Sequence, residues 1–255
     1  MHHTGTVYTN IAGKIAKIVF EHPKSNCLPK KLITELSTTI DKYSLTQNIN
    51  GVIIASSGDK TFCAGASFDE LCSLTDQSEA LDFFSEFAKL LISIKKCEIP
   101  VLARVQGKAV GGGVGIIATC DYAIGCSRSS VCLSELTLGF GPYVISPALI
   151  RKIGLANFSA LTLSSDWHSA EWAFKRGLLN EVVEKKEDLD TACNKLTDLW
   201  NNNDRAALVS IKKLLWSSAE NWEELLLDRA SESAKLVLSA YSQGKLKEFK
   251  LKRPN

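Results

Sequence analysis

The distribution of apolar residues along the chain is the feature that most limits its possible folds. Short continuous apolar runs, such as GVIIAS at 51–56 and VLARVQG at 101–107, have the length of buried strands. Longer segments with helical spacing lie among them, for example residues 30–43 and 79–96. From about residue 187 the pattern is helical throughout. Strands that alternate with helices, followed by helices alone, predict an α/β core with an α-helical C-terminal region.

Two further helices are predicted from their start and stop signals. In ISPALIRKIG we expect Ser146 to cap the helix, Pro147 to occupy its first position and Gly154 to end it. In HSAEWAFKRGL the expected cap is Ser169 and the expected stop is Gly177. Both helices belong to the part of the chain that precedes the all-helical end.

Length and charge exclude several classes of protein. The 255 residues are 45% hydrophobic and 23% charged, as in ordinary globular proteins, and predict one large domain or one domain with an appendage. The net charge of +2 lacks the basic excess that nucleic acid or an anionic membrane favours. No apolar run reaches the about 18 residues of a membrane span, and MHHTGTVYTN shows no secretory signal. We therefore expect a cytoplasmic protein without a nucleic-acid or membrane partner.

The cysteines predict neither disulfides nor a metal site. There are eight, none forms a C-x-x-C pair, and most lie in apolar runs. Buried free thiols in a reducing compartment are the expected state. The four histidines are not spaced with them as a ligand set.

Four glycines interrupt an apolar region in AVGGGVG, residues 109–115. Each glycine inside a helix or strand costs about 0.5–1 kcal/mol relative to alanine, so the cluster needs a reason. A phosphate loop, close packing of a helix on a sheet, and backbone amides held open for a ligand are the alternatives. The order G-G-G-V-G lacks the G-x-G-x-x-G spacing of dinucleotide loops, and no Walker Lys-Ser/Thr pair follows. A nucleotide phosphate site is therefore not expected here.

A second strand-to-helix junction lies in TFCAGASFDEL, residues 61–71, after the strand at 51–56. Like the glycine cluster, it carries small residues and leads into a predicted helix. Two such junctions after parallel strands can lie side by side. The N–H groups at each helix N-terminus carry partial positive charge, and two converging N–H groups are what an oxyanion hole requires.

The chain contains three motifs in the order FCAGASFDEL, QGKAVGGGVGIIATCDYAIG and LSELTLGFGP. Together they resemble the crotonase superfamily, the enoyl-CoA hydratase/isomerase family. SNCLP, SAEWAFKRGLLNEVV and FKLKRPN extend the resemblance over nearly the whole chain. It implies an α/β fold, with a crotonase-like spiral of ββα units over residues 1–190 and a C-terminal helical trimerisation region over 191–255. It also implies a homotrimer, or a hexamer formed by two trimers.

The resemblance further implies a catalytic site for acyl-CoA thioesters. In this family two backbone N–H groups, here those of Ala66 and Gly112, bind the thioester oxygen, and a glutamate, here Glu135, transfers a proton. Hydratases of the family carry another glutamate where this chain has Gly115. Two carboxylates can position a water and divide acid and base work, whereas one can still move a proton between two carbons. We expect a 2-enoyl- or 3-enoyl-CoA substrate and leave hydratase and isomerase open.

The segment GFGPYVISPALIRKIG, residues 139–154, keeps further reactions open. It resembles bacterial hydratases of the methylglutaconyl-CoA type and related decarboxylases. It places Tyr143 near the substrate pocket, either as a hydroxyl donor or as a packing residue, and Phe68 and Gly115 are the other expected pocket residues. A non-catalytic crotonase-fold protein that binds RNA or acts as a scaffold is the alternative of another class, and the small net charge speaks against RNA.

Coenzyme A is expected only as part of the substrate, and no metal or redox cofactor is expected. The resemblance assigns Asn26 and Leu28 in SNCLP, together with Ala64, to the coenzyme A site. Phe249 and Lys250 in the basic C-terminal segment KLKEFKLKRPN are also assigned there. Such a segment is equally typical of a solvated tail.

Overall fold

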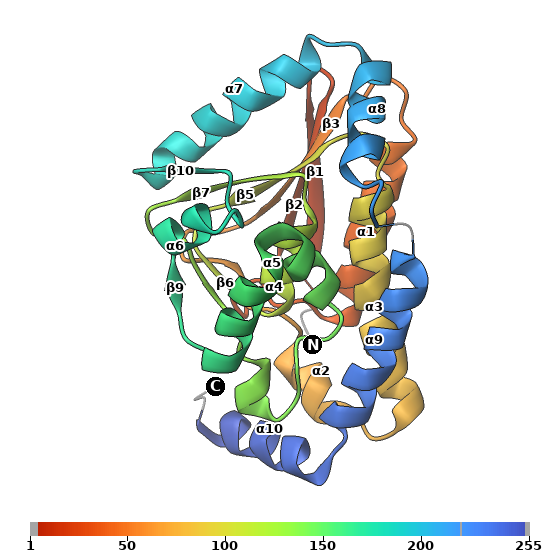
Figure 1. Ribbon diagram of the computed structural model, residues 1–255, viewed down its shortest axis with the longest axis vertical. Helices are drawn as coiled ribbons and strands as arrows, with labels where there is room; N and C mark the ends of the chain where they lie inside the picture. The colour runs from red at the N-terminus through yellow and green to blue at the C-terminus, as the bar shows by residue number, and fades with distance from the viewer. Residues whose placement is uncertain (1–4, 220, 253–255) are drawn as a thin grey trace.

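A computed structural model describes residues 5–219 and 221–252 of the protein (Figure 1). Its first sheet has six strands in the order β1-β2-β3-β5-β7-β10. The first two form an antiparallel hairpin, and all later neighbours are parallel. Their bounds are β1 Thr6–Ala12, β2 Ile15–Glu21, β3 Gly51–Ser56, β5 Val101–Val105, β7 Tyr122–Cys126 and β10 Glu181–Val183.

A second sheet of four short strands has the order β4-β6-β8-β9, in which only β9 is antiparallel. Its bounds are β4 Thr61–Cys63, β6 Lys108–Val110, β8 Ser130–Cys132 and β9 His168–Ser169. The chain passes from a strand of the first sheet to a strand of the second and then into a helix, three times in succession. This repeated ββα turn is the spiral that the sequence predicted.

Among the described residues, helices make up most of the remaining chain, and the elements after β10 are all helical, as predicted. The predicted helices at 30–43 and 79–96 correspond to α1 and α3. The bounds are α1 Lys30–Ser44, α2 Phe68–Ser73, α3 Gln77–Lys96, α4 Gly112–Thr119, α5 Ser146–Ser164, α6 Ala170–Lys175, α7 Leu189–Asn201, α8 Arg205–Leu215, α9 Trp222–Val237 and α10 Ala240–Lys252, with short 3-10 turns η1 Glu135–Leu138 and η2 Lys186–Asp188.

Three of the predicted helix-end signals are wrong in position and two are confirmed. Pro147 is the second residue of α5 rather than its first, whereas Gly177, with a φ of +78°, directly follows the C-cap residue of α6 as predicted. Ser146 is the first residue of α5 rather than its cap, and its hydroxyl donates to the carbonyl of Tyr143 at 2.7 Å. Gly154 does not end α5: its φ of +75° makes a kink, and the helix continues to Ser164. Glycine reaches this φ at little cost, so a glycine inside a helical pattern can mark a bend as well as an end. Ser169 caps α6 as predicted, accepting from the N–H of Trp172.

Helices cover both faces of the larger sheet (Figure 1). One face packs against α7, where Leu189, Cys193 and Trp200 join Ile53 and Leu102 of the strands in a small apolar cluster. The main core lies on the other side, among α1, α3, α4 and α5. Helix α9 runs beside α3, and α10 lies beneath α2 and η1. These C-terminal helices thus cover the core of their own chain, and the predicted boundary at residue 190 and a role in trimer assembly stay predictions.

A buried ion pair fixes α8 to the core. Lys212 and Asp121 are 3% and 5% exposed, and their charged atoms lie 2.6 Å apart. Asp121 also accepts from the indole N–H of Trp216 and the backbone N–H of Val101, each at 2.7 Å. Lys212 donates in addition to the carbonyl of Ile94 at 3.0 Å. The pair is therefore satisfied on both sides, as a buried ion pair must be.

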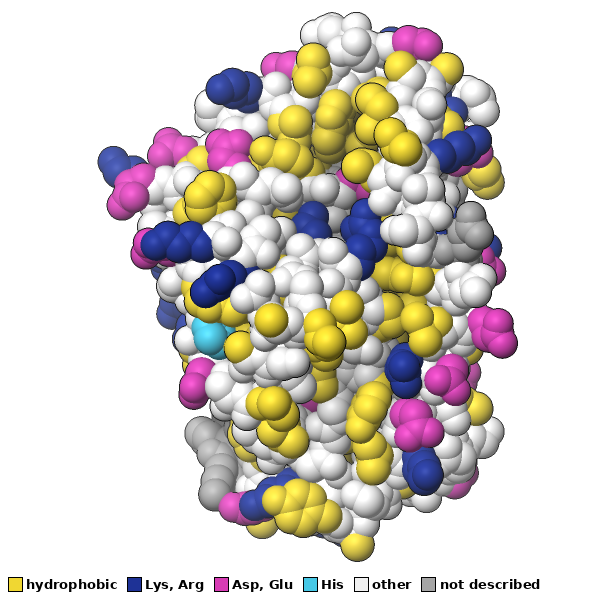
Figure 2. All heavy atoms as spheres, viewed as in Figure 1, with side chains coloured by type: hydrophobic (Ala, Val, Ile, Leu, Met, Phe, Trp, Pro, Cys, Tyr) yellow, Lys and Arg dark blue, Asp and Glu magenta, His cyan; other side chains and the backbone are white. Residues whose placement is uncertain are grey.

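Two global expectations can be checked against this structure. All eight cysteines are free, and all but Cys72 are buried. Within residues 5–219 and 221–252, no helix is long and apolar enough to cross a membrane. On the face shown in Figure 2, acidic and basic side chains occur in small separate groups.

The parallel order of the second sheet sets the position of the candidate site. Strands β4, β6 and β8 are neighbours, and each is followed directly by a helical turn: α2, α4 and η1. Parallel neighbours end at the same edge of a sheet. The edge therefore brings together Ala66 just before α2, Gly112 at the start of α4 and Glu135 at the start of η1.

Candidate active site

A cavity of about 590 Å³ opens at this edge. Residues from all three junctions line it, and side chains from α3, α9 and α10 close it. Eight of the expected site residues lie on its wall: Ala64, Ala66, Phe68, Gly112, Glu135, Tyr143, Phe249 and Lys250. Asn26, Leu28 and Gly115 do not.

The two expected amide donors lie close to each other on the cavity wall. Ala66 forms a parallel bridge with Leu28, in which the flanking residues Gly65 and Ser67 make the hydrogen bonds. Gly112 begins α4, where a backbone N–H has no partner within the helix. A Cβ atom added at Gly65 would lie 3.6 Å from the nitrogen of Gly112, so the two junctions touch. Neither amide donates to another described residue.

Close packing under α4 explains the glycines that the sequence left unexplained. A Cβ atom at Gly112 would lie 2.7 Å from the ring of Phe87, and one at Gly113 would lie 2.6 Å from Cβ of Cys63. Gly111 has a φ of +49°, a conformation that side chains disfavour. The helix therefore approaches both α3 and β4 more closely than any other residue would permit.

The carboxyl group of Glu135 lies against Gly111. A Cβ atom at Gly111 would be 2.6 Å from Oε1, so only glycine leaves this space free. Oε2 is buried and has no hydrogen-bond partner among the described residues. Burial raises the pKa of this carboxyl from its ordinary 4.5 to about 7, since removal from water disfavours the charged form. A carboxyl of this kind can both take and return a proton near neutral pH.

At residue 115, where hydratases of the family carry another glutamate, the side chain of Ile145 fills the space. Gly115 is buried in α4, and a Cβ atom there would lie 2.3 Å from Cγ2 of Ile145. Ile145, which is 3% exposed, lines the cavity instead. No carboxylate therefore fits at residue 115 unless Ile145 moves.

Aromatic side chains form the buried end of the cavity. Phe83, Phe84 and Phe87 come from α3 and Phe140 from the loop after η1, and all are at most 8% exposed. The rings of Phe84 and Phe140 meet edge to face with centroids 6.4 Å apart. The sequence pattern assigned the three α3 residues only to the buried face of an amphipathic helix.

The open end of the cavity is basic and aromatic. Lys24 forms an ion pair with Asp69 there, and the ammonium group of Lys108 lies 5.1 Å from the ring centre of Trp167. Phe249 of α10 packs on Phe68 with ring centroids 5.2 Å apart. These contacts join segments that are far apart in the chain, so no local sequence signal pointed to Lys24, Lys108 or Trp167.

Asn26 and Leu28 hold the SNCLP loop in place. The side-chain amide of Asn26 donates to the carbonyls of Ser57 and Thr61 at 2.7 and 2.9 Å, and its oxygen accepts from the N–H of His22 at 3.1 Å. Its φ is +54°. Leu28 is fully buried. Both residues thus shape the wall from behind.

Comparisons with known proteins identify the family of the chain. The model of the family "Enoyl-CoA hydratase/isomerase" matches residues 10–249. The chain is 32% identical over 176 residues to a crotonyl-CoA hydratase of Syntrophomonas wolfei, covering 68% of this chain and 67% of that one. It is 30% identical to the mitochondrial methylglutaconyl-CoA hydratase of Rattus norvegicus, covering 68% of this chain and 55% of that one.

A solved structure of a related protein has the same fold. The solved structure of an enoyl-CoA hydratase from Mycobacterium avium superposes with a TM-score of 0.86 at 27% identity, covering 99% of this chain and 98% of that one. The crotonase-like fold predicted from the sequence is therefore confirmed. The protein is an enzyme of the enoyl-CoA hydratase/isomerase family.

Proposed function

We propose that this enzyme shifts the double bond of an enoyl-CoA by moving one proton between two carbons, from a 3-enoyl to a 2-enoyl thioester. The observation that carries the proposal is the single carboxylate in the buried part of the cavity. Of the described acidic residues on the cavity wall, Glu135 and Asp69, the second is 46% exposed and paired with Lys24. Only Glu135 can thus reach a buried acyl chain.

The proton balance of the shift needs one acid–base group. The thioester oxygen would accept hydrogen bonds from the N–H groups of Ala66 and Gly112. The carboxylate of Glu135 would take a proton from C2, and the electron pair would move into the carbonyl to give an enolate. The same carboxyl would then return the proton to C4 as the double bond settles between C2 and C3. A pKa of about 7 suits a group that must act as base and then as acid.

The packing around α4 supports a shift over hydration. A hydratase must also hold and activate a water molecule. The position from which the family's second glutamate would do this is occupied by the side chain of Ile145. An apolar wall at this point favours a reaction in which only the substrate carbons exchange the proton.

The proposal is tested by product analysis over a panel of 2-enoyl-CoA and 3-enoyl-CoA substrates. We expect conversion of the 3-enoyl to the 2-enoyl thioester, with deuterium placed at C2 of the substrate appearing at C4 of the product. Glu135→Gln should lower kcat by at least 10²-fold, as the loss of an acid–base group typically does. Glu224→Gln, at a surface site, is the matched control and should keep full activity. A 3-hydroxyacyl-CoA as the main product would refute the shift in favour of hydration.

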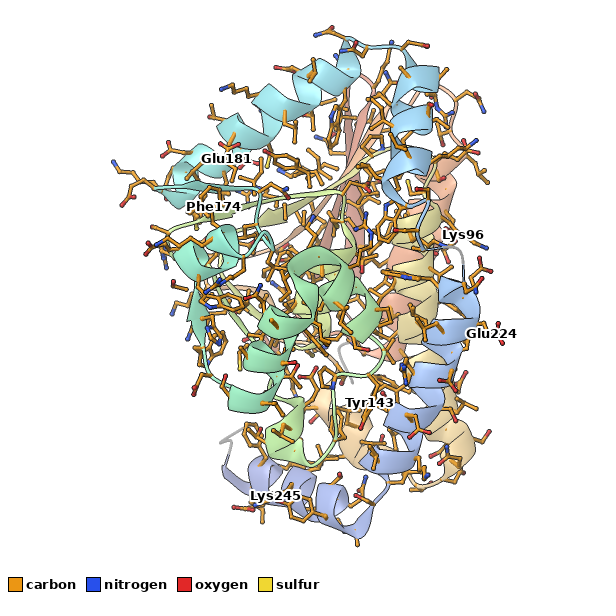
Figure 3. The ribbon with its side chains drawn as sticks, in the orientation of Figure 1. Lys96, Tyr143, Phe174, Glu181, Glu224 and Lys245 are labelled. Atoms are coloured by element: carbon orange, nitrogen blue, oxygen red, sulfur yellow. The ribbon has the colours of Figure 1, made fainter. Side chains whose placement is uncertain are left out.

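A hydratase or decarboxylase of the methylglutaconyl-CoA type is the second candidate, and Tyr143 is the observation in its favour. Tyr143 lies on the cavity wall in the loop before α5, with its ring over Gly141 (Figure 3). Its hydroxyl makes no hydrogen bond to another described residue, so it is free to act on a water or a carboxylate of the substrate. A methylglutaconyl-CoA turnover that Tyr143→Phe lowers at least tenfold would favour this reaction.

The open end of the cavity suits the coenzyme A part of the substrate. Lys108 and Lys250 are exposed there, beside the aromatic rings of Trp167 and Phe249. Ammonium groups attract phosphates, and rings can stack on a base. We expect Lys250→Gln to raise KM severalfold without changing kcat. An unchanged KM for both Lys250→Gln and Lys108→Gln would exclude this end as the phosphate site.

A further inference from the structure

The cavity wall holds a buried hydroxyl group that the proposed reaction does not use. Ser233 of α9 is 2% exposed and lines the cavity. Its neighbours on the buried face of the helix, Leu226, Ala230, Ala234 and Val237, are all apolar. A serine is therefore the exception on a face whose other members serve only packing.

The hydroxyl of Ser233 has no hydrogen-bond partner among the described residues. Serine inside a helix commonly donates to the carbonyl four residues earlier, as Thr34 and Thr38 do in α1. Ser233 makes no such bond, nor a bond to any other described residue. Oγ of Ser233 is not among the described side-chain atoms that are both fully buried and unpaired, so the hydroxyl opens onto the cavity that the residue lines. A polar group in such a place is satisfied by a ligand or a water molecule.

The contacts of α9 place Ser233 at the aromatic end of the cavity. Helix α9 packs along α3 (Figure 1), and α3 supplies Phe83, Phe84 and Phe87 to the wall. The thioester oxygen would lie at Ala66 and Gly112, and coenzyme A would extend toward the exposed lysines. Ser233 therefore faces the part of the acyl chain that lies beyond the reacting carbons.

The charges on the wall limit which polar group can occupy this end. The described cations that line the cavity are Lys24, Lys108 and Lys250, and all three are exposed at its mouth. The buried end carries the carboxyl group of Glu135 and no cation among the described residues. A carboxylate on the acyl chain would therefore be buried unpaired and close to a like charge. A neutral oxygen can both accept from and donate to a serine hydroxyl.

Resting on the proposed reaction, we infer that the enzyme acts on acyl-CoA thioesters whose chain carries a neutral oxygen, a hydroxyl or oxo group, beyond the reacting carbons. Ser233 binds that oxygen and determines the preference over plain hydrocarbon chains. A site that is built to hydrogen-bond a substrate oxygen discriminates against the analogue that lacks it, because its own polar group is then left unpaired.

The test compares kcat/KM for enoyl-CoA substrates of equal length, with and without a hydroxyl or oxo group on the distal carbons. The wild type should prefer one oxygenated substrate about tenfold, equivalent to about 1.4 kcal/mol. Ser233→Ala should abolish this ratio. Ser231→Ala, an exposed serine on the same helix, is the matched control and should keep it. The ratio is taken within each variant, so a general loss of folding or activity does not change it.

The outcomes separate this inference from the proposed reaction. Equal kcat/KM for all chains in the wild type, or an unchanged ratio in Ser233→Ala, would overturn the role of Ser233 and leave the proton shift intact. If no substrate is turned over, Kd values for the saturated acyl-CoAs with and without the oxygen test Ser233 by binding alone. A preference there that Ser233→Ala removes would support the inference even though the reaction had been assigned wrongly.

Discussion

The buried carboxyl group of Glu135 should make the protein less stable than a neutral isostere would. Its pKa rises from 4.5 to about 7 on folding because burial disfavours the charged form. The folded state therefore holds the proton between these pH values, where the unfolded state has already released it. Stability must then fall as the pH rises from 4.5 to 7. Glu135→Gln keeps the shape of the side chain and removes the charge.

The size of the effect follows from the two pKa values. A rise from 4.5 to about 7 corresponds to about 3 kcal/mol, at about 1.36 kcal/mol for each pKa unit. At pH 8 both states are ionised and nearly the whole cost, about 3 kcal/mol, is present. At pH 5 the unfolded state is only partly ionised and about 1 kcal/mol remains. Because Oε2 has no partner among the described residues, the substitution breaks no hydrogen bond at that atom.

Urea unfolding of the wild type and Glu135→Gln at pH 5 and pH 8 measures this cost. The variant should be more stable by about 3 kcal/mol at pH 8 and by about 1 kcal/mol at pH 5, an increase of about 2 kcal/mol in the gap. The control Glu224→Gln, whose side chain points away from α9 into solvent in Figure 3, should change stability by less than about 0.5 kcal/mol at both pH values. A gap that does not widen with pH, or a variant that is less stable at pH 8, would refute the assignment of a raised pKa to Glu135.

Three other results are expected. If Glu135 is the base, kcat/KM should rise about tenfold per pH unit below its pKa of about 7 and level off above it; a pH-independent kcat/KM would exclude this role. Gly115→Glu should destabilise the protein by at least about 2 kcal/mol through the clash with Ile145, and adding Ile145→Ala should restore part of that; additive losses in urea unfolding would contradict the clash. Lys212→Met should lower stability by about 3–5 kcal/mol because the Asp121 carboxylate stays buried without its cation. Thermal unfolding that shifts by less than 2 °C would show that the pair contributes little.

The meeting of the three candidate catalytic residues at one sheet edge could be predicted because it depends on connectivity. Ala66, Gly112 and Glu135 each follow a short apolar strand and stand at or next to the start of a helical turn. Once the strands are parallel neighbours, their ends must meet at one edge. The pattern of strands and helices therefore predicts that these residues meet, although it gives no distance among them.

Helix ends were harder to predict because local signals have more than one meaning. Gly154 is typical of a helix stop, yet α5 continues through it to Ser164 with a kink. Beyond the kink, Leu161 is fully buried in the core and Phe158 packs against it, whereas Leu155 and Leu163 are exposed. Tertiary burial of the next turns therefore outweighed the local preference to end the helix.

The buried end of the cavity could not be predicted at all, and the reason is physical. Phe83, Phe84 and Phe87 repeat at helical spacing, and this pattern states only that one face of α3 avoids water. A face that packs on other side chains and a face that waits for an apolar ligand both avoid water, so they have the same composition. A polar side chain on the apolar face distinguishes the two cases. In a closed core its polar group would have no hydrogen-bond partner, whereas beside a cavity a ligand can supply one. Ser233 is such a side chain in α9, and only the contact of α9 with α3 reveals that the hydroxyl faces a cavity.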